Sequence, residues 1–471
     1  MTAKTKIVAT IGPASDSEAM VRKLILAGVN LFRLNFSHGS HEQHLLRLRR
    51  IRKVAKRLKR NVGIIQDLSG PKIRLGILSP DKILLKPGST VRLFAGAESS
   101  APDLLPVSYP RLARDLKKGD QILLGDGEIE LRALGVDAGK VICRVIVGGQ
   151  ISSKKGVNFP SERLTVSTIT AKDRADLSVG VKAGVDYVAL SFVRKAADIL
   201  ALRRLIQNLG ADIPIIAKIE TISALRNIDE IVAATDAVMV ARGDLGVEVP
   251  LEEIPAVQKN LIRKANLMAK PVITATQMLR SMVENNRPTR AEVTDVANAI
   301  YDGTDAVMLS EESAVGKYPV EAVETMTRIA LESEQDFYNL RKIERSGSNT
   351  DTVPEAISAS AVEMAEAMKV KAIVTPSRSG YTARLVSRFR PRPPILALSP
   401  DREVVKRLSL VWAVQAHYCP DLEKQRDLLD YASRLARKIL KLKKGDLIAI
   451  TAGLPIGKTP RTNLVKLEKI E

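Results

Sequence analysis

Short apolar segments alternate with longer amphipathic segments through the first two thirds of the chain. Eight of the short segments are rich in Val, Ile, Leu and Ala, and they begin near residues 6, 30, 62, 185, 213, 236, 271 and 305. Runs of this length and composition are typical of buried strands. The segments between them repeat apolar residues at helical spacing and often end at Gly or Asn, as helices do. Parallel strands joined by helices predict a (β/α)8 TIM barrel.

The connection after the third strand is much longer than the others. This strand ends near Asp67 and the next helical pattern starts near residue 172, which leaves about a hundred residues. Three segments within it alternate apolar and polar residues around Pro-Gly and Gly-Asp-Gly turns: KILLKPGSTVRLF, QILLGDGEIELRAL and KVICRVIVGGQI. This pattern indicates a small antiparallel β domain. Because it is inserted in a βα loop, it would lie over the barrel mouth and can act as a lid.

A second change follows the eighth strand and its helix. The polar segment IERSGSNTD, 343–351, predicts a linker, and alternating helical and strand patterns after it predict an open α/β sheet. GLPIGKT, 453–459, looks like a phosphate loop but has three residues between its glycines where that motif has four. We therefore expect a barrel domain in two parts, a small inserted β-barrel lid and a C-terminal α/β regulatory domain: 1–70 with 167–342, 71–166, and 343–471.

Composition narrows the class of protein. No window approaches the ~18 apolar residues that a membrane span requires, and the first residues lack the organisation of a signal peptide. The two cysteines, Cys143 and Cys419, are far apart, which excludes a disulfide framework and favours a reducing compartment. We expect a cytoplasmic protein without a membrane partner.

The formal net charge of +20 favours anionic partners, from nucleic acids to phosphorylated metabolites. Much of the excess lies in RLRRIRKVAKRLKR, 47–60, where apolar residues at helical spacing predict an amphipathic helix with a solvated basic face. An aromatic content of 3% leaves few platforms for stacking bases. We expect no nucleic-acid partner, although a basic nucleic-acid-binding protein remains an alternative.

Polar residues stand where seven of the predicted strands end, the place where TIM barrels carry catalytic groups. Helix capping can explain Asp, Ser and Thr at such positions, but it does not explain Lys218 or Arg242. Lys218 and Glu220 are two residues apart on one strand, so their side chains point to the same side. The full set is Arg33, Asn35, Asp67, Ser191, Lys218, Glu220, Arg242, Asp244, Thr274, Thr276, Ser310 and Glu312.

The charges in this set suit phosphoryl transfer. Glu220 and Asp244 offer two carboxylates to a hard cation that keeps several waters and takes other ligands from an anionic substrate, as Mg²⁺ does. Lys218 and Arg33 beside that cation would neutralise a phosphate in transfer. The four histidines lack a zinc-ligand spacing, and we expect solvated or capping roles for His41 and His44.

Nine segments of the sequence, spread over the whole chain, resemble pyruvate kinase. The resemblance is strongest over 1–75 and 154–322. It implies transfer of the phosphoryl group of phosphoenolpyruvate to ADP, giving pyruvate and ATP in the last step of glycolysis, with Mg²⁺ or Mn²⁺ and in a homotetramer. The segments are TKIVATIGPAS, LFRLNFSHG, QDLSGPKIR, KKGVNFP, AKIE, MVARGDLGVE, VITATQML, RPTRAEVTDVANAIYDGTDAVMLSEE and GKYPVEAV.

The resemblance also implies roles for residues that match the family's motifs. Lys218, Arg33 and Thr276 match the catalytic positions, and Lys218 would stabilise the transition state and the enolate. The substrate-binding positions are Arg33, Lys218, Gly243, Asp244 and Thr276, and the Mg²⁺ ligands are Glu220 and Asp244. The nucleotide-binding positions are Asn35, Phe36, Ser37, His38, Arg74 and Lys155.

Three residues depart from the family's pattern. Members that need K⁺ bind it at the positions of Asn35, Ser37, Asp67 and Leu68 and carry Glu where this chain has Lys72. An ammonium group there can supply the charge of the missing cation, so we predict that K⁺ is not required. The other departures are Glu311, where many members have Gly, and Arg280, where many have Glu.

TPSRSGYTAR, 375–384, resembles the family's effector loop, which would bind a sugar phosphate or a nucleotide. Its candidate donors are Thr375, Ser377, Ser379, Gly380 and Thr382, although a plain glycine-containing βα turn would look similar. Another Mg²⁺-dependent barrel acting on a pyruvate enolate, an aldolase or a lyase, would share the carboxylates and the arginine. Such enzymes need no nucleotide lid, and the long insert therefore argues against them.

Overall fold

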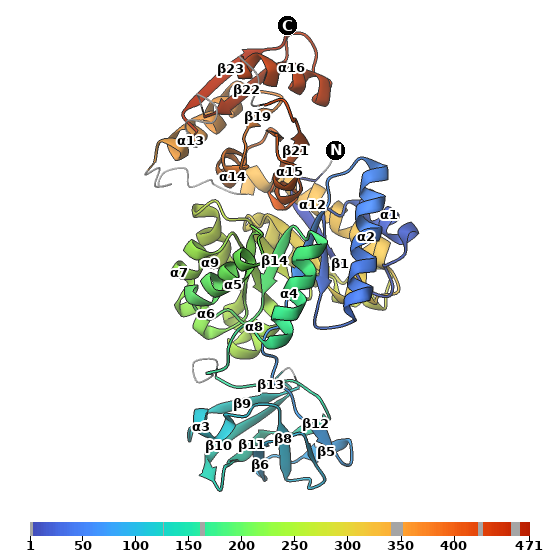
Figure 1. Cartoon of the computed structure of the whole chain (residues 1–471), viewed down its shortest axis with the longest axis vertical. Coiled ribbons are helices and arrows are strands. Elements are labelled where there is room, and N and C mark those ends of the chain that lie inside the picture. Colours follow the sequence, from blue (N-terminus) through green and yellow to red (C-terminus); the bar gives the residue numbers. More distant parts are fainter. Residues whose placement is uncertain (1–2, 126, 161–164, 341–351, 423–426, 454–461) are drawn as a thin grey trace.

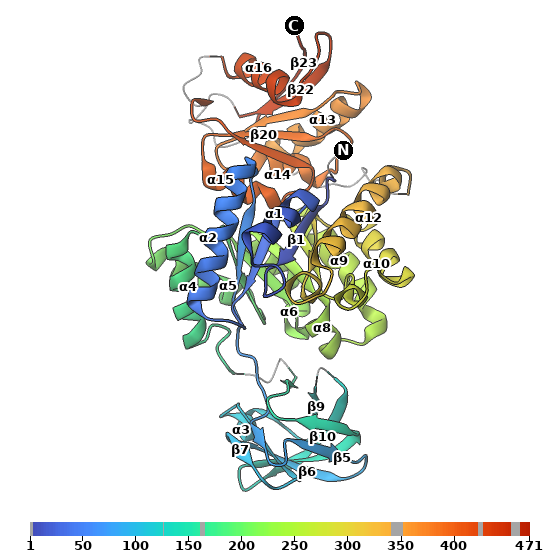
Figure 2. The same ribbon diagram turned by 90° about the vertical axis from the view of Figure 1, so that its right-hand side faces the viewer.

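The structure is a computed structural model that describes residues 3–125, 127–160, 165–340, 352–422, 427–453 and 462–471. Three units follow one another along the long axis of the molecule (Figure 1). A helix-covered barrel lies in the middle, a β unit lies at one end and a mixed α/β unit at the other, and the view turned by 90° gives the same order (Figure 2). The middle unit is built from both sides of the β unit in sequence.

The barrel consists of eight parallel strands that close on themselves in the order β1-β18-β17-β16-β15-β14-β3-β2. They coincide with the eight predicted strands, and the predicted TIM barrel is confirmed. Their bounds are β1 (Lys6–Thr10), β2 (Leu31–Asn35), β3 (Gly63–Asp67), β14 (Tyr187–Leu190), β15 (Ile215–Ile219), β16 (Ala237–Ala241), β17 (Val272–Ala275) and β18 (Ala306–Leu309).

Helices surround these strands, and several of them start at a side-chain cap. Ser40 and Gln43 form a capping box at the start of α2, and Thr170 and Asp173 form another at α4. The helices and 3₁₀ turns of the barrel are α1 (Glu18–Ala27), α2 (His41–Leu58), α4 (Ala171–Ala183), α5 (Ala196–Asn208), α6 (Ile222–Arg226), α7 (Ile228–Ala234), α8 (Arg242–Glu248), η1 (Leu251–Glu253), α9 (Ile254–Leu267), η2 (Arg280–Val283), α10 (Arg290–Tyr301), α11 (Glu311–Ala314) and α12 (Pro319–Leu340).

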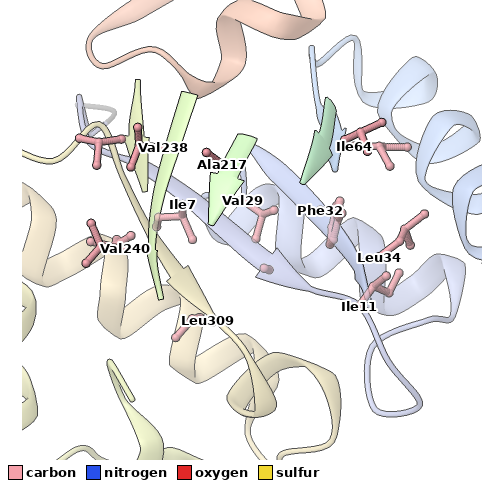
Figure 3. Close-up of a cluster of buried hydrophobic side chains, with 14 of the residues drawn as sticks. Ile7, Ile11, Val29, Phe32, Leu34, Ile64, Ala217, Val238, Val240 and Leu309 are labelled. Atoms are coloured by element: carbon pink, nitrogen blue, oxygen red, sulfur yellow. The ribbon is translucent and has the colours of Figure 1, made fainter. Parts of the chain in front are cut away.

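Alternate residues of each strand belong to two separate apolar clusters. One contains Ile65, Ile216 and Met239, and the other contains the intervening residues together with the buried faces of the helices. Figure 3 shows side chains of the second cluster, among them Phe32 and Val240, on several strands. The first cluster therefore fills the barrel interior, since successive strand residues point to opposite faces.

The β unit is built on its own apolar core between β3 and α4. Its main sheet has the order β13-β9-β10-β11-β6-β8 and is accompanied by the pairs β12-β5 and β4-β7. Its elements are β4 (Ile77–Leu78), β5 (Lys82–Leu85), β6 (Thr90–Ala95), β7 (Glu98–Ser99), β8 (Leu104–Val107), α3 (Leu112–Asp115), β9 (Gln121–Leu124), β10 (Ile129–Asp137), β11 (Lys140–Val147), β12 (Gly149–Ser152) and β13 (Val157–Asn158). We call this unit the lid.

Two strand pairs correct the prediction of an antiparallel lid. β6 pairs with β8 in parallel, and so does β4 with β7. Alternation of apolar and polar residues is the same in both kinds of pairing, so the sequence pattern could not distinguish them.

The C-terminal unit has a five-stranded sheet in the order β21-β20-β19-β22-β23, in which only β22 and β23 are antiparallel neighbours. The predicted open α/β sheet is confirmed, but β23 was not predicted because this edge strand is rich in Lys and Glu. The elements are α13 (Val353–Ala367), β19 (Ile373–Pro376), α14 (Tyr381–Arg388), β20 (Ile395–Ser399), α15 (Arg402–Arg407), η3 (Leu408–Leu410), β21 (Val414–Tyr418), α16 (Leu428–Leu440), β22 (Leu447–Ala452) and β23 (Leu464–Lys469).

Buried polar contacts fasten the C-terminal unit to the barrel. Arg390, which is 1% exposed, donates to Asp305 at 2.8 Å and to Asn266 at 2.8 Å. Lys6 Nζ donates to the carbonyl of Val414 at 2.9 Å. The predicted linker 343–351 and nearly all of GLPIGKT lie outside the described residues. Within the described part of the chain, no helix is long and apolar enough to cross a membrane.

Candidate active site at the barrel mouth

Strand alternation brings charged side chains into the open end of the barrel. Lys218 and Glu220 continue the row of Ile216, and Asp67 continues the row of Ile65, both of which belong to the interior cluster. Arg33 likewise follows Leu31 on β2. The polar residues therefore replace apolar packing where the strands end, on the side of the barrel to which the lid is connected (Figure 1).

Lys218 lies at the centre of this group. Its Nζ atom is 2.9 Å from Glu220 Oε1, 3.4 Å from Asp67 Oδ1 and 2.7 Å from Ser191 Oγ. Burial lowers the pKa of Lys218, but the attraction of Asp67 and Glu220 outweighs it and the net shift is upward. The side chain therefore presents a permanent positive charge in a largely dehydrated place.

Glu220 is the buried carboxylate that best fits a metal ion. Burial and the nearby charge of Asp244 raise its pKa to about 7, although Lys218 acts in the opposite direction. Its Oε2 accepts from the backbone N–H of Phe192 at 2.7 Å, whereas its buried Oε1 lies 2.9 Å from the Lys218 ammonium and has no partner with hydrogen-bond geometry among the described residues. A buried carboxylate with an oxygen that lacks a well-directed donor, and with a second carboxylate close by, suits a hard divalent cation.

Arg33 and Asp67 form the second charged pair of the mouth. Arg33 Nε is 2.6 Å from Asp67 Oδ2, and its Nη1 donates to Thr10 Oγ1 at 3.2 Å. Burial would raise the pKa of Asp67, but Lys218 and Arg33 lower it below its ordinary value. The carboxylate thus stays ionised and fixes both cations.

Thr276 ends β17 in an unusual backbone conformation. Its φ is +70° and that of Gln277 is +56°, in the left-handed region that a β-branched residue rarely adopts. Thr276 Oγ1 accepts from the N–H of Gly243 at 2.8 Å, and Arg242 Nη2 donates to the carbonyl of Thr276 at 2.8 Å. Asp244 stands in the first turn of α8 on the same loop, so this network joins Thr276 to the second carboxylate.

The predicted nucleotide-binding residues form two groups. Asn35 ends β2 and Phe36 to His38 follow it in a turn, where Asn35 Oδ1 accepts from the N–H of Ser37 at 3.1 Å and the Ser37 and His38 side chains are exposed. Arg74 and Lys155 lie in the two chain segments that connect the lid, and Arg74 Nη1 donates to the carbonyl of Lys154 at 3.0 Å. The first group belongs to the barrel and the second to the lid.

The expectation for His44 was wrong. His44 is 3% exposed, stacks on Phe36 with ring centroids 4.0 Å apart, and places Nε2 2.8 Å from the carbonyl of His38. It therefore supports the turn that carries Asn35 to His38. His41 is half-exposed, and its Nε2 lies 2.7 Å from Asp176 Oδ1. The turn and helix pattern gave no sign that one of these histidines would be packed against an aromatic ring.

The ammonium of Lys72 does not reach Asp67, whose cationic partners are Arg33 and Lys218. The side chain of Lys72 is exposed, forms no ion pair with any described residue, and lines a narrow cleft of about 50 Å³ between the lid connections and the barrel rim. Asp244 lines the same cleft. Leu68 is buried, and its carbonyl accepts from Ser191 Oγ at 2.7 Å.

Two of the polar residues predicted at strand ends have structural contacts instead. Thr274 points to the helix side of the barrel, where its Oγ1 bonds to Thr304 Oγ1 at 3.0 Å. Glu312 is 1% exposed and accepts from the N–H groups of Leu279 and Ser310 at 3.1 and 2.8 Å. The strand boundary alone could not distinguish residues with such structural contacts from residues that face the barrel mouth.

The two unexplained departures, Arg280 and Glu311, form an ion pair with each other. Arg280 Nε lies 3.0 Å from Glu311 Oε2, and both side chains are more than half exposed. A pair of this kind contributes little to stability. Each residue thus compensates for the charge of the other at the edge of the site.

Comparisons with known proteins agree on one family. The barrel-domain model of pyruvate kinase matches residues 2–323, and the α/β-domain model matches 355–468. Pyruvate kinase of Geobacillus stearothermophilus is 48% identical over 474 residues, covering 100% of this chain and 81% of that protein. Pyruvate kinase 2 of a Synechocystis strain is 47% identical over 472 residues, with 99% and 79% covered.

The chain belongs to the pyruvate kinase family. A crystal structure of a pyruvate kinase from Cryptosporidium parvum has the same fold, with a TM-score of 0.91, 36% identity, and coverage of 100% of this chain and 96% of that chain. The reaction of pyruvate kinases is the transfer of a phosphoryl group from phosphoenolpyruvate to ADP. The full-length match favours this reaction over the aldolase, lyase and nucleic-acid-binding alternatives.

The segment that resembles the pyruvate kinase effector loop joins β19 to α14. Gly380 caps α14 with a left-handed φ of +73°, Thr382 Oγ1 lies 2.7 Å from Thr462 Oγ1, and the buried Thr375 Oγ1 has no hydrogen-bond partner among the residues that the structure describes. Ser377 and Ser379 complete the predicted set on the same turn. The five residues are therefore close in the chain and in the fold.

Proposed function

We propose that the charged cluster at the barrel mouth is the site at which this chain transfers the phosphoryl group of phosphoenolpyruvate to ADP. The observation that carries the proposal is the position of Lys218 between the buried carboxylates of Glu220 and Asp67, with Arg33 on the far side of Asp67. A fixed cation held between buried carboxylates at the end of the barrel to which the lid is connected is suited to stabilise a phosphoryl group in transfer.

Glu220 and Asp244 would hold Mg²⁺ or Mn²⁺. The burial of the Glu220 carboxylate and the effect of Asp244 on its pKa support this assignment. Such a cation supplies charge neutralisation to the phosphoryl oxygens and leaves coordination positions for water and substrate.

The residues of the chain then have distinct tasks. Lys218 and Arg33 neutralise the phosphoryl group from two directions, and Lys218 also stabilises the enolate oxygen left behind. The hydroxyl of Thr276, held against Gly243, lies where it can contact the substrate and position a proton donor. Asn35, Phe36, Ser37 and His38 on the barrel and Arg74 and Lys155 on the lid would bind the nucleotide between them.

Lys218→Met tests the central assignment. We expect turnover to fall about a thousandfold or more, or about 4 kcal/mol in activation free energy, because methionine leaves the phosphoryl group and the enolate without the Lys218 ammonium. The measurement is pyruvate formation from phosphoenolpyruvate, with and without ADP and Mg²⁺.

Lys23→Met, on the exposed face of α1, is the matched control and should keep full turnover. Circular dichroism should show both variants folded. Wild-type turnover in Lys218→Met would refute the role of Lys218.

We further propose that activity does not require K⁺. Lys72 on the lid connection lines the cleft beside Asp244, so closure of the lid could bring its ammonium toward Asp67 and Leu68, while Asn35 and Ser37 stand on the neighbouring turn. Turnover should stay within about twofold when K⁺ is replaced by tetramethylammonium, and Lys72→Glu should create a K⁺ requirement. Activity of the wild type that collapses without K⁺ would contradict the proposal.

Three features of the family are proposed for the assembled protein. The first is a homotetramer, and sedimentation velocity would measure this oligomeric state. A sugar phosphate or nucleotide effector at Thr375, Ser377, Ser379, Gly380 and Thr382 is supported by the free hydroxyl of Thr375. A cytoplasmic location is supported by two cysteines that are both free and buried.

A further inference from the structure

The first turn of α4 lies between the two parts of the proposed nucleotide site. One part is the turn of Phe36 to His38 after β2, which we call the nucleotide turn, and the other consists of Arg74 and Lys155 on the lid connections. α4 starts where the second lid connection ends, and it packs beside α2, which follows the nucleotide turn (Figure 2). Lys172 and Asp173 are neighbours in this first turn of α4, and each of them contacts residues outside the helix.

Lys172 binds the nucleotide turn from the side of α4. Its Nζ atom donates to the carbonyl of Phe36 at 2.6 Å and to Asp176 Oδ2, one helical turn further along, at 2.6 Å. The Asp176 side chain is 2% exposed, and its other oxygen lies 2.7 Å from His41 Nε2. The buried carboxylate therefore limits the orientations of Lys172, and the hydrogen bond to Phe36 fixes the plane of the peptide that carries the N–H of Ser37.

A second residue holds the nucleotide turn from α2. His44 places Nε2 2.8 Å from the carbonyl of His38 and stacks on Phe36. This contact is independent of α4, so the nucleotide turn should keep its fold when Lys172 is replaced. Loss of Lys172 should therefore loosen the turn without unfolding it.

Asp173 holds the barrel ends of both lid connections. It is 0% exposed, and its Oδ2 atom accepts from the N–H and the hydroxyl of Thr170, at 2.9 and 2.6 Å, at the end of the second connection. Its Oδ1 atom accepts from the N–H of Gly70, at the start of the first connection, at 3.2 Å. Gly70 has a φ of +65°, and a Cβ atom there would lie 3.0 Å from the Phe192 ring. The first connection therefore leaves the barrel at a position that favours glycine, and a buried carboxylate fixes it there.

The two lid connections are also paired with each other. The N–H of Leu75 donates to the carbonyl of Lys155 at 2.9 Å, and Arg74 forms a β-bridge with Gly156. Since paired strands move together, the direction that Asp173 sets at the barrel also sets the positions of Arg74 and Lys155.

We propose that Lys172 and Asp173 are positioning residues for ADP. Lys172 sets the nucleotide turn, Asp173 sets the lid connections, and one helical turn thereby fixes the distance between the two parts of the site. The inference rests on the proposed nucleotide site, because both residues act through groups that would bind ADP. A site held in this way is preorganised, which reduces the entropy lost when the nucleotide binds. Phosphoenolpyruvate would be bound by Arg33 and Lys218 in the barrel mouth, so its affinity should depend much less on this turn of α4.

Lys172→Met tests the contact with the nucleotide turn. We expect the KM for ADP to rise about fivefold or more, because a charged hydrogen bond to the turn is lost, while kcat and the KM for phosphoenolpyruvate stay within about twofold. Calorimetric titration of the full-length protein with ADP and Mg²⁺, without phosphoenolpyruvate, should show a similar rise in Kd. Lys172→Arg should bring both values back toward those of the wild type, since a guanidinium can still donate to the carbonyl.

Lys182→Met is the matched control on the same helix. Lys182 is exposed in the last turn of α4, so its replacement should leave the KM and the Kd for ADP at their wild-type values. Circular dichroism should show that all variants are folded.

Asp173→Asn tests the hold on the lid connections. An asparagine offers one acceptor oxygen where Asp173 uses two, so one of the two connections loses its hydrogen bonds. We expect the KM and the Kd for ADP to rise about threefold or more. Glu355→Gln changes the corresponding capping residue of α13 in the C-terminal unit, and it should not alter ADP binding.

Arg74→Gln separates this inference from the proposed nucleotide site. Arg74 would contact ADP directly, so its loss should raise the KM for ADP whatever the role of α4. The inference is wrong if Lys172→Met leaves the KM and the Kd for ADP unchanged, if it weakens the binding of both substrates equally, or if Asp173→Asn binds ADP as the wild type does. If Arg74→Gln also leaves ADP binding unchanged, the proposed nucleotide site is wrong as well.

Discussion

At the scale of single residues, the backbone of Thr276 shows how the site stores conformational strain. A β-branched residue with φ of +70° costs of order 1–3 kcal/mol unless its surroundings impose it. Arg242 supplies that constraint through hydrogen bonds to the carbonyls of Ala275 and Thr276 at 3.3 and 2.8 Å. Arg242 itself is fixed by Asp295 at 2.7 Å. We infer that Arg242 is a positioning residue for the hydroxyl of Thr276.

Arg242→Gln should therefore lower kcat by about 10- to 100-fold, because a misplacement of about 1 Å is enough for such a loss. The KM for ADP should change little, since the nucleotide residues lie on other loops. Steady-state kinetics with each substrate varied in turn would measure both.

Asp295→Asn is the matched control for Arg242. It removes the ion pair but keeps the hydrogen bonds of Arg242 to the Thr276 loop, so its effect on kcat should be much smaller. If Arg242→Gln and Asp295→Asn lowered kcat equally, the ion pair with Asp295, and not the contact with the Thr276 loop, would account for the loss of activity.

At the scale of elements, the buried ion pair of Arg390 and Asp305 joins the barrel to the C-terminal unit. Asp305, just before β18, accepts from Arg390 and also from the N–H groups of Trp412 and Val272, at 3.1 Å each. One carboxylate thus connects β18, β17 and the segment before β21. Its contacts depend on both units being in place.

Arg390→Met should lower the free energy of unfolding by about 3–5 kcal/mol, because it leaves the carboxylate of Asp305 buried without its main partner. Urea denaturation followed by tryptophan fluorescence suits the measurement, since Trp412 lies at this junction.

Arg434→Met removes an ion pair whose two side chains are 68% and 56% exposed, and should change stability by less than about 1 kcal/mol. A comparably small effect of Arg390→Met would mean that water replaces the lost partner of Asp305.

At the scale of the whole molecule, Lys6 makes the stability of the barrel and C-terminal unit depend on pH. Burial lowers its pKa to about 8, although Glu334 and Asp305 act in the opposite direction. An unfolded lysine has a pKa of about 10.4. Between these values the unfolded chain binds more protons, so the stability rises with pH; below about pH 8 the full cost of burying the ammonium is present.

Lys6→Met should remove this dependence. The unfolding free energy of the wild type relative to Lys6→Met should rise by about 2–3 kcal/mol between pH 7 and pH 10. Urea titrations at both pH values measure it, and Lys23→Met again serves as the exposed control. If the difference in unfolding free energy between the wild type and Lys6→Met did not change with pH, Lys6 would keep an ordinary pKa in the folded protein.

The sequence predicted the large features because each had a local signature. Eight apolar runs separated by amphipathic segments leave few folds other than the barrel, and Lys218 with Glu220 on one strand has no ordinary structural explanation. Side-chain alternation also predicts that these two residues point to the same side of the strand where it ends.

The features that escaped prediction depend on contacts distant in sequence. The stacking of His44 on Phe36, the pairing of Arg280 with Glu311, and the contact of Thr274 with Thr304 leave no periodic trace. A cavity between the barrel and the C-terminal unit is likewise formed by strand starts and helices that are far apart in the chain. Parallel pairing in the lid was missed because the pleat has the same alternation in either direction.

The place of the lid in the chain bears on how the barrel can assemble. β3 and β14 are neighbours, with Ile65 opposite Tyr187, although the entire lid is translated between them. The two connections of the lid pair side by side at Arg74 and Gly156, and its core is independent of the barrel. Once the lid has folded, its two ends lie side by side. Most of the chain entropy that is lost on closing a hundred-residue loop is then lost when the lid folds, and not when β3 and β14 pair. The insertion therefore need not slow the search by which the eighth strand finds the first.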